Sequence, residues 1–323
     1  MFTPTFAVSA AALALVLGVS HAGAADYPTK AVRVVVPVAP GGGTDFIARL
    51  LSQELSERLG QMFVVDNREG AGGSIGAQLV ATASADGYTL ILGYTASHGI
   101  NPALSKLPYD PVKNFTPISL VTTATNMLVV HPAVPVKTVP ELITYAKSKP
   151  GQLRYASAGN GTAPHMSGEL FNLMAGTKMI HVPYKGNGPA LVDVLGGHVE
   201  LTFSSLPAGL PHGKSGKLRM VAVTSLKRST IMPELPTVAE AGLSGFDTDQ
   251  WYGVLGPANL PESLLARLSK ETIAATKSKS FVDKARAQGF EVVGGTPTQF
   301  RTHITTEVAK WKDLVKRANI QVE

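Results

Sequence analysis

Three glycine-rich loops each join the end of an expected strand to the start of an expected helix. They are Ala39–Asp45 (APGGGTD), Arg68–Ser74 (REGAGGS) and Ser157–Thr162 (SAGNGT). A helix N-terminus exposes unpaired N–H groups and a partial positive charge, and glycine lets the backbone approach a ligand closely. Each loop can therefore hold an anion such as a carboxylate. The alternative for each loop is a tight turn that only caps its helix.

The strength of helix-end binding favours a closing cleft over a single loop. One helix end contributes about 0.3–1 kcal/mol to anion binding, or ~2 kcal/mol when it is partly buried. Micromolar affinity needs about 8 kcal/mol. Two facing loops, each with charge-assisted hydrogen bonds of about 1.5–3 kcal/mol, reach that value when water is excluded. We therefore expect the loops to face each other across a cleft, beyond the carboxyl ends of the strands.

Two segments resemble enzyme motifs. The string Gly72–Gly76 (GGSIG) matches the G-x-S-x-G nucleophile elbow, but residues 67–71 separate Ser74 from the preceding strand, and no Asp/His pair accompanies it. A secreted α/β hydrolase that uses Ser74 stays as an alternative. Gly209–Ser215 (GLPHGKS) is one residue short of a phosphate-binding P-loop and does not follow a strand.

The remaining chemistry rests on histidines and glycines. No cysteine is present, and the 8 histidines show no metal-ligand spacing, so we expect neither a metal nor a cofactor. The glycine pairs at 41/43 and 159/161 lack the third glycine of a dinucleotide fingerprint. His98 follows a strand and His165 begins a helix. Each can donate to a ligand carboxylate or serve as a hydrogen-bonded structural histidine.

Short apolar runs alternate with helical stretches, the pattern of α/β architecture. Val32–Val38 is typical of a buried strand and Phe46–Leu59 of an amphipathic helix. Further strands are expected at Phe63–Asp66, Thr89–Gly93, Arg154–Ala156, Ile180–Pro183, Glu200–Phe203 and Leu218–Thr224.

Two extended stretches, Pro117–Val130 and Gln250–Leu255, interrupt this alternation. They are placed to carry the chain out of one lobe and back again. We therefore expect one lobe at residues 25–124 plus 250–323 and the other at residues 125–249. Thr296 and Gln299 form a capping-box signature for the last helix. Its apolar stripe of Phe300, Ile304, Val308, Trp311 and Val315 predicts core packing.

The N-terminus has the form of an export signal. Ala7–Val19 is apolar and precedes small residues at Ala22 and Ala24, which predicts a signal peptide at residues 1–24 and a mature start at Ala25. Residues 1–6 carry no Lys or Arg, so a buried N-terminal helix is the alternative. The run is well below the ~18 residues that a spanning helix needs.

Composition fits a globular chain of 323 residues, 44% of them hydrophobic and 16% charged. The net charge is 29 − 23 = +6, and the excess is spread along the sequence. Nucleic-acid binding needs a dense basic stripe with stacking aromatics, and the sequence has neither.

Seven segments together resemble the Bug family, the periplasmic receptors of tripartite tricarboxylate transporters. They are VPVAPGGGTDFIAR, DNREGAGGSIGA, ADGYTLILG, TASHGINPAL, YASAGNGTAPHMSGELF, VPYKGNGPALVDVLGG and LPTVAEAG, and the resemblance extends from Tyr27 onward. It implies a type II periplasmic-binding-protein fold with two α/β lobes that close around a small organic acid. It also implies no catalysis and two integral membrane transporter subunits as partners, and we expect a monomer. Besides the receptor and the hydrolase, a third hypothesis is a sensor that signals to a membrane kinase.

The resemblance also implies ligand contacts. In the family a carboxylate is held largely by backbone groups and bridging waters from the first loop and its counterpart in the other lobe. The matching positions here are Ala39, Gly41, Gly42, Gly43 and Asp45, and Ser157, Gly159, Gly161 and Thr162, with Ser97 and His98 as a third wall.

Two positions depart from the family pattern. Glu69 stands where proline is usual, and Ser204-Ser205 follows Phe203 where an aspartate is common. We hypothesise that Ser204 at this strand end suits a bulkier or less polar acid, including an aromatic one. Unchanged binding of such acids to a Ser204→Asp variant would contradict this hypothesis.

Overall fold

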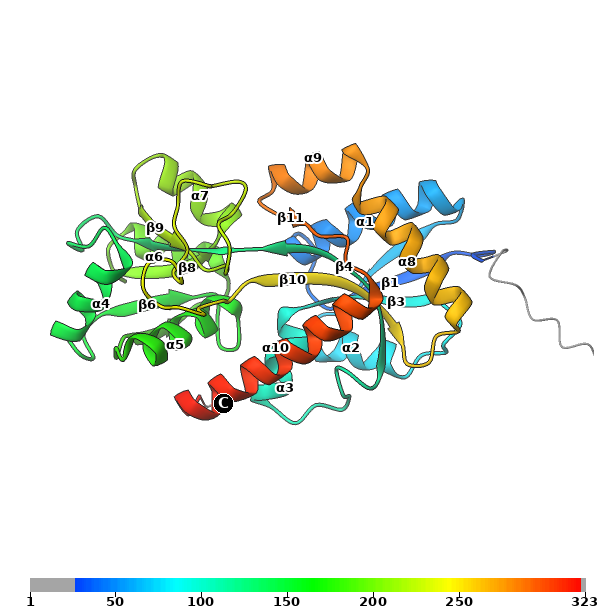
Figure 1. Cartoon of the computed structure of the whole chain (residues 1–323), viewed down its shortest axis with the longest axis horizontal. Coiled ribbons are helices and arrows are strands. Elements are labelled where there is room, and N and C mark those ends of the chain that lie inside the picture. The colour runs from blue at the N-terminus through cyan, green and yellow to red at the C-terminus, as the bar shows by residue number, and fades with distance from the viewer. Residues whose placement is uncertain (1–26, 321–323) are drawn as a thin grey trace, which may run out of the picture.

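The computed structural model describes residues 27–320, which form two α/β lobes joined by extended strands (Figure 1). The expected signal peptide and its cleavage site lie outside the described residues. The sheet of the first lobe has the strand order β11-β4-β10-β3-β1-β2, and that of the second lobe β7-β6-β8-β5-β9. The type II fold expected from the resemblance is confirmed.

The strands of the first lobe are β1 (Val32–Val36), β2 (Phe63–Asn67), β3 (Thr89–Tyr94), β4 (Phe115–Ala124), β10 (Gln250–Pro257) and β11 (Glu291–Val292). Those of the second are β5 (Asn126–Val130), β6 (Arg154–Ser157), β7 (Ile180–Pro183), β8 (Leu201–Ser205) and β9 (Arg219–Val223). The helices of the first lobe are α1 (Gly43–Leu59), α2 (Ser74–Ala81), α3 (Asn101–Leu104), α8 (Glu262–Thr276), α9 (Lys279–Ala287) and α10 (Pro297–Ala318), with a 3₁₀ turn η1 (Ala71–Gly73) and a π-turn η2 (Ala96–Ile100). The helices of the second lobe are α4 (Val139–Ser148), α5 (Ala163–Ala175), α6 (Asn187–Leu195) and α7 (Leu206–Lys214).

Parallel strands place the loops that precede the helices. In the first lobe β1 pairs in parallel with β2 and β3, and in the second β6 pairs in parallel with β7 and β8. The carboxyl ends of parallel strands meet at one edge of a sheet, so the helices that follow them begin there. The first helix begins at Gly43, three residues before the expected Phe46, because extended Gly42 serves as its N-cap.

The two crossovers run through β4 into β5 and from residue 249 into β10. The expected single extended stretch, Pro117–Val130, is interrupted at Thr125, where the chain leaves one sheet and enters the other. The Thr125 hydroxyl donates to the Asn126 carbonyl at 3.0 Å and accepts from the Ser225 N–H at 3.1 Å. Side chains alternate between the two faces of a strand, so neighbouring crossover residues point to opposite sides of the hinge.

Each lobe has its own apolar core, and a further cluster joins them. Ile100, Trp311 and Leu314 of the first lobe pack around Met166 of the second. Trp311 and Leu314 lie on α10, which runs from the first lobe toward α5 of the second (Figure 1). The capping box of α10 is confirmed, and four residues of its apolar stripe are buried, with Val315 partly buried.

Within the described residues, no helix combines the length and apolarity needed to cross a membrane.

Candidate functional site

A cavity of about 450 Å³ lies between the lobes. The first lobe and its crossovers contribute Gly41, Gly42, Gly43, Phe46, Ala124, Gln250, Tyr252, Gln288 and Phe290, and the second lobe contributes Asn187, Ser205, Pro207 and Ala208. The cavity volume falls within the range of small-molecule sites.

Three helices begin at this cavity. They are α1 at Gly43, α6 at Asn187 and α7 at Leu206, whose N-cap Ser205 lines the wall. The first N–H groups of a helix have no partner within it, and the aligned peptide dipoles place partial positive charge there. The cavity therefore receives positive potential from both lobes.

None of the residues that line the cavity carries a formal charge. An anion in the cavity would be held by backbone N–H groups and neutral polar side chains, which suits a carboxylate. An ammonium group there would find no carboxylate to pair with.

Three aromatic rings form one wall of the cavity. Phe46 and Phe290 lie nearly parallel, with ring centres 6.0 Å apart and an angle of 18° between the planes. Tyr252 meets Phe290 edge-on at 5.5 Å. The Tyr252 hydroxyl donates to Gln250 Oε1 at 3.1 Å, and burial raises the pKa of this phenol, so it stays neutral.

The loop Ala39–Asp45 is held in place by the Asp45 carboxylate. Its Oδ2 accepts from the Gly41 N–H at 3.0 Å and from Arg49 Nε at 2.9 Å, and its Oδ1 accepts from Asn67 at 3.0 Å. Burial acts to raise the pKa of Asp45, but these hydrogen bonds outweigh burial and hold the pKa below its ordinary value. Asp45 is buried and shapes the loop, whereas Ala39 is exposed, and neither lines the cavity.

The loop Ser157–Thr162 is similarly fixed by its own side chains. Ser157 Oγ lies 2.6 Å from His181 Nε2 and accepts from the Gly159 N–H, while the Thr162 hydroxyl donates to the Gly159 carbonyl at 2.6 Å. The Gly161 N–H donates to His165 Nδ1 at 3.1 Å.

His165 stacks on His181 at 4.0 Å. Burial lowers the pKa of His165 to about 4, so its ring is neutral and its Nδ1 can accept the hydrogen bond from the Gly161 N–H. None of Ser157, Gly159, Gly161, Thr162 and His165 lines the 450 Å³ cavity, and their ligand role stays a prediction.

Ser97 and His98 are fully buried and do not line the cavity. His98 Nδ1 lies 2.8 Å from Ser97 Oγ, and the ring meets Phe115 edge-on at 4.6 Å. Burial lowers the pKa of His98 to about 3. Their ligand role also stays a prediction, and their contacts are those of a structural pair.

The strand end at Ser204-Ser205 divides between core and cavity. Ser204 is 1% exposed, and its hydroxyl donates to the Ser205 carbonyl at 3.2 Å. Ser205 lines the cavity and accepts from Asn187 Nδ2 at 3.3 Å. Of the two serines, Ser205 is therefore the one placed to affect ligand specificity. The ligand role of Ser204 stays a prediction.

Sequence reasoning missed most of the cavity wall. Gln250 and Tyr252 were within an expected strand, and their alternation with Trp251 was the one available signal for which side they face. Phe290 and Gln288 follow a helix far along the chain and offer no local motif. Among the lining residues, sequence reasoning named Gly41, Gly42 and Gly43 as ligand contacts and Ser205 as part of the strand end that departs from the family pattern.

Ser74 lacks the partners of a catalytic serine. It is the first residue of α2 and is buried. Within residues 27–320, no histidine or carboxylate hydrogen-bonds to its Oγ. The G-x-S-x-G string therefore begins a helix and does not assemble a triad.

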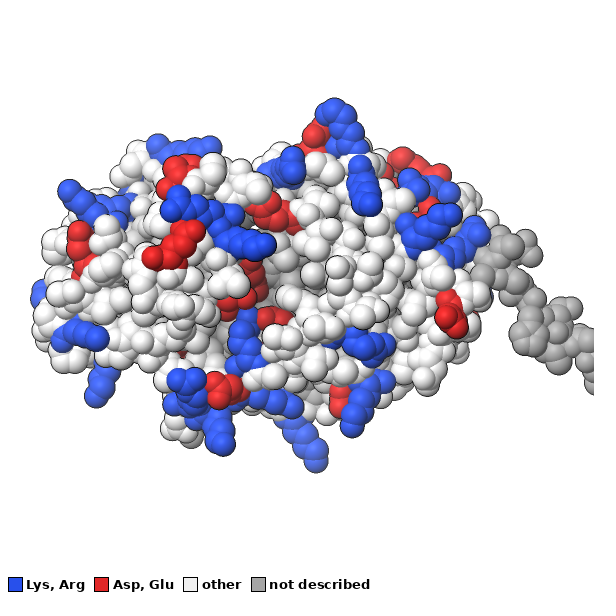
Figure 2. Space-filling model, in the orientation of Figure 1, with Lys and Arg blue, Asp and Glu red and all other residues white. Residues whose placement is uncertain are grey.

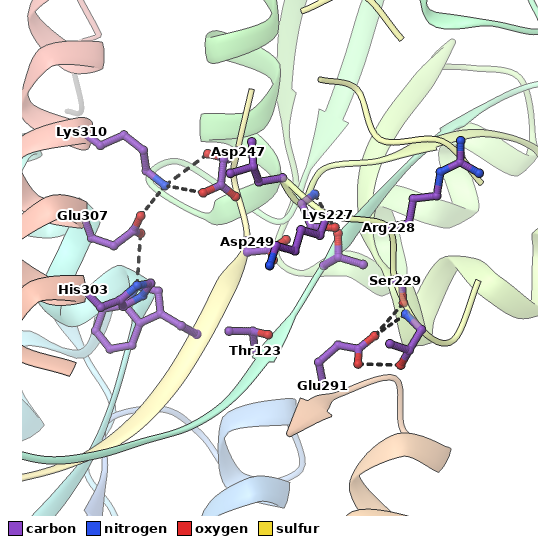
Figure 3. A pocket seen from close by; sticks show the side chains of 15 residues that line it. Thr123, Lys227, Arg228, Ser229, Asp247, Asp249, Glu291, His303, Glu307 and Lys310 are labelled. Carbon is purple, nitrogen blue, oxygen red and sulfur yellow. Dashed lines mark hydrogen bonds and ion pairs between the residues drawn. The ribbon is translucent and has the colours of Figure 1, made fainter. Parts of the chain in front are cut away.

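A second cavity, of about 380 Å³, lies on the other side of the crossovers and is lined by Thr123, Asp249 and Trp251 (Figure 3). Lys310 pairs with Glu307 and Asp247, and Glu291 bonds to neutral polar groups of the second lobe. Glu291 of the first lobe accepts from the Thr230 N–H at 2.7 Å and the Ser229 hydroxyl at 3.0 Å in the second lobe. We call this cavity the rear pocket.

Lys310 links the lobes at the opposite end of the rear pocket. It pairs with Glu307 and donates to the Asp247 carbonyl at 3.2 Å (Figure 3). Acidic side chains lie in the groove between the lobes on the face seen in Figure 2. No group of three or more potential metal ligands occurs among the residues described. The rear pocket is an interlobe junction, whereas the helix N-termini converge on the first cavity.

The chain is similar to known proteins over nearly its whole length. A family model described as "Tripartite tricarboxylate transporter family receptor" matches residues 47–320. Protein BugT of Bordetella pertussis is 37% identical over 300 residues, which is 92% of each chain. A protein encoded in the tcbD-tcbE intergenic region of Pseudomonas sp. is 36% identical over 90% of this chain and 86% of its own length.

Solved structures agree with the sequence matches. An R. palustris protein solved with adipate has a TM-score of 0.80 and 40% identity, covering 92% of this chain and 99% of its own. MatC from Rhodopseudomonas palustris, with bound malate, has a TM-score of 0.76 and 33% identity, covering 90% and 100%. The structure of the periplasmic binding protein BugD has a TM-score of 0.76 and 34% identity, covering 92% and 100%. The matched family and the two-lobe fold agree throughout, and the chain belongs to the tripartite tricarboxylate transporter receptor family, whose members are periplasmic solute-binding receptors.

Proposed function

We propose that this protein is a periplasmic receptor that captures a small organic acid in the interlobe cavity and delivers it to a tripartite tricarboxylate transporter. The observation that carries the proposal is the convergence of three helix N-termini on a cavity without charged side chains. Relatives solved with adipate and malate support a carboxylate as the ligand.

The proposal also covers export, oligomeric state, membrane partners and the bounds of the lobes. The chain is exported and cleaved between Ala24 and Ala25, acts as a monomer without catalysis, and meets two integral membrane subunits. Residues 25–124 plus 250–323 form the first lobe and residues 125–249 the second. The sheet-to-sheet passage at Thr125 supports the first boundary, and the start of β10 at Gln250 supports the second.

A thermal-shift screen of the mature chain tests the proposal. A ligand at a hundredfold excess over its dissociation constant stabilises the folded form by about 2.7 kcal/mol. We expect the melting temperature to rise with one or more carboxylates and to stay unchanged with the matching primary amides, which lack the negative charge. If no carboxylate raises it, or if the chain hydrolyses esters and Ser74→Ala abolishes that activity, the proposal is wrong.

A further inference from the structure

The side chains around the helix N-termini restrict the part of the ligand that is not the carboxylate. This inference rests on the proposed function, because it assumes that a carboxylate binds at these N-termini. The rest of the molecule then lies against the aromatic wall of Phe46, Tyr252 and Phe290 and against Ala124, Pro207 and Ala208. These side chains are largely apolar, and the neutral polar side chains of Asn187, Gln250 and Gln288 share the lining with them.

An amino group is poorly accommodated in this cavity. An ammonium removed from water without a charged partner costs several kcal/mol. The side-chain oxygens available to it belong to neutral groups, and Gln250 Oε1 already accepts from the Tyr252 hydroxyl. The positive potential of the three helix N-termini further disfavours a cation.

The aromatic wall lies close to the backbone at the start of α1, where the proposed carboxylate would bind. Phe46 and Phe290 stack at 18°, and Tyr252 supports Phe290 edge-on. A Cβ atom added to Gly43 would lie 2.9 Å from the Phe290 ring, so this ring rests directly on the start of α1. A planar ring attached near a carboxylate would meet this wall while the carboxylate meets the N–H groups.

We propose that the cavity selects an aromatic carboxylate that lacks an amino group. The helix N-termini hold the carboxylate, the aromatic wall holds the ring, and the uncharged lining rejects amino acids. Ser205 is the position at which this rejection can be changed, because it lines the second-lobe wall and accepts a hydrogen bond from Asn187.

A matched ligand series tests the proposal by isothermal titration calorimetry on the mature chain. The pair 3-phenylpropanoate and L-phenylalanine differs only by the amino group, and adipate serves as an aliphatic dicarboxylate for comparison. We expect 3-phenylpropanoate to bind at least ~100-fold more tightly than L-phenylalanine, since an unpaired buried charge costs more than 2.7 kcal/mol. We also expect it to bind more tightly than adipate.

Two variants separate the aromatic wall from the charge selection. Phe46→Leu keeps an apolar side chain at a half-buried position and removes its ring. It should weaken 3-phenylpropanoate about fivefold relative to adipate, which is the internal control. Ser205→Asp should narrow the preference for 3-phenylpropanoate over L-phenylalanine at least ~10-fold, because it supplies the missing carboxylate. Circular dichroism confirms that both variants are folded.

The outcomes distinguish this inference from the proposed function. Comparable binding of L-phenylalanine and 3-phenylpropanoate, or tighter binding of adipate than of 3-phenylpropanoate, overturns the inference and leaves the carboxylate receptor intact. The same holds if Phe46→Leu weakens both carboxylates equally. If no carboxylate binds, the proposed function falls and the inference falls with it.

Discussion

At the scale of single residues, Asp249 is the acid most altered by its position in the hinge. Its half-buried carboxyl lines the rear pocket, and its Oδ1 has no hydrogen-bond partner among residues 27–320. Burial, and secondarily the nearby Asp247, raise the pKa of Asp249 to about 8, while Thr125 and Lys310 act in the other direction. The folded pKa therefore exceeds the value of about 3.9 for an unfolded aspartate.

The raised pKa of Asp249 predicts that the folded chain loses stability as the pH rises. The folded chain binds the Asp249 proton more tightly than the unfolded chain does, so this stabilising contribution is complete below pH ~4 and disappears as the pH rises toward ~8. Asp249→Asn should flatten the decline in melting temperature between pH 5 and pH 8.5 and should be the more stable protein at pH 8.5. Exposed Asp313→Asn is the control. If the plots of melting temperature against pH are parallel for wild type and Asp249→Asn, the raised pKa does not belong to Asp249.

Substitutions at two neighbouring glycines of the first loop should separate the effect on ligand affinity from the effect on stability. Gly42 has φ −86°, and a Cβ atom added there meets nothing within 4 Å, so Gly42→Ala should keep its stability within about 0.5 kcal/mol. Its methyl group would enter the cavity at the start of α1 and weaken carboxylate binding about tenfold or more. Gly43→Ala should lose both affinity and stability, because its Cβ would press on Phe290. Thermal melting and calorimetry measure the two effects, and unchanged carboxylate affinity in Gly42→Ala would place the ligand elsewhere.

A cavity residue can be predicted from the sequence only when neighbouring residues in the chain indicate its role. Gly41, Gly42 and Gly43 lie next to one another after an apolar strand, so the sequence alone indicated a loop able to hold an anion. Phe290 reaches the same cavity from a distant part of the chain through tertiary packing, and no local pattern reveals this. The ligand role of Asp45 stays a prediction, and its carboxylate already accepts from the Gly41 N–H, Arg49 and Asn67.

At the scale of elements, strands and helix starts were more predictable than the transitions between sheets. Apolar runs and capping residues are local, and Ile180–Pro183 has the bounds expected from the sequence. The break at Thr125 depends on where two sheets separate in space. The stretch stays rich in β-branched residues up to Thr125 and resumes apolar residues at Met127, so strand propensity could not show the interruption.

The capping box of α10 supports a prediction about this longest helix. The Thr296 side chain accepts from the Gln299 N–H, and the Gln299 side chain accepts from the Thr296 N–H at 2.9 Å. Thr296→Ala should cost about 1 kcal/mol of unfolding free energy, which corresponds to about 2–4 °C in melting temperature. Thr305→Ala, on the exposed face of the same helix, should change it by less than about 0.5 kcal/mol. Equal losses in the two variants would show that the cap has no special role.

At the scale of the whole molecule, the relative orientation of the lobes decides whether the helix N-termini act together. The cluster of Ile100, Met166, Trp311 and Leu314 is an apolar contact between the lobes. The bonds of Glu291 to Ser229 and Thr230 provide a polar contact beside the rear pocket. Sequence reasoning predicted two lobes from two crossovers, but it could not predict these contacts, because each joins segments that become neighbours only after both lobes have folded.

Met166, which is fully buried, and Met174, which is partly buried, provide a paired test of this coupling, since both lie on α5 of the second lobe. Met166 packs against the first lobe, whereas Met174 packs against the core of its own lobe. Because the described orientation brings the helix N-termini of both lobes to one cavity, removing a contact specific to that orientation reduces the population able to bind. Met166→Ala should therefore weaken binding of the most stabilising carboxylate about tenfold, and Met174→Ala should lower the melting temperature with little effect on affinity. Calorimetry gives the affinities, and small-angle scattering should show a larger radius of gyration for unliganded Met166→Ala than for unliganded Met174→Ala. Equal affinities and equal radii would mean that the apolar contact follows lobe orientation without controlling it. The polar contacts of Glu291 and Lys310 between the lobes would then be the next to test.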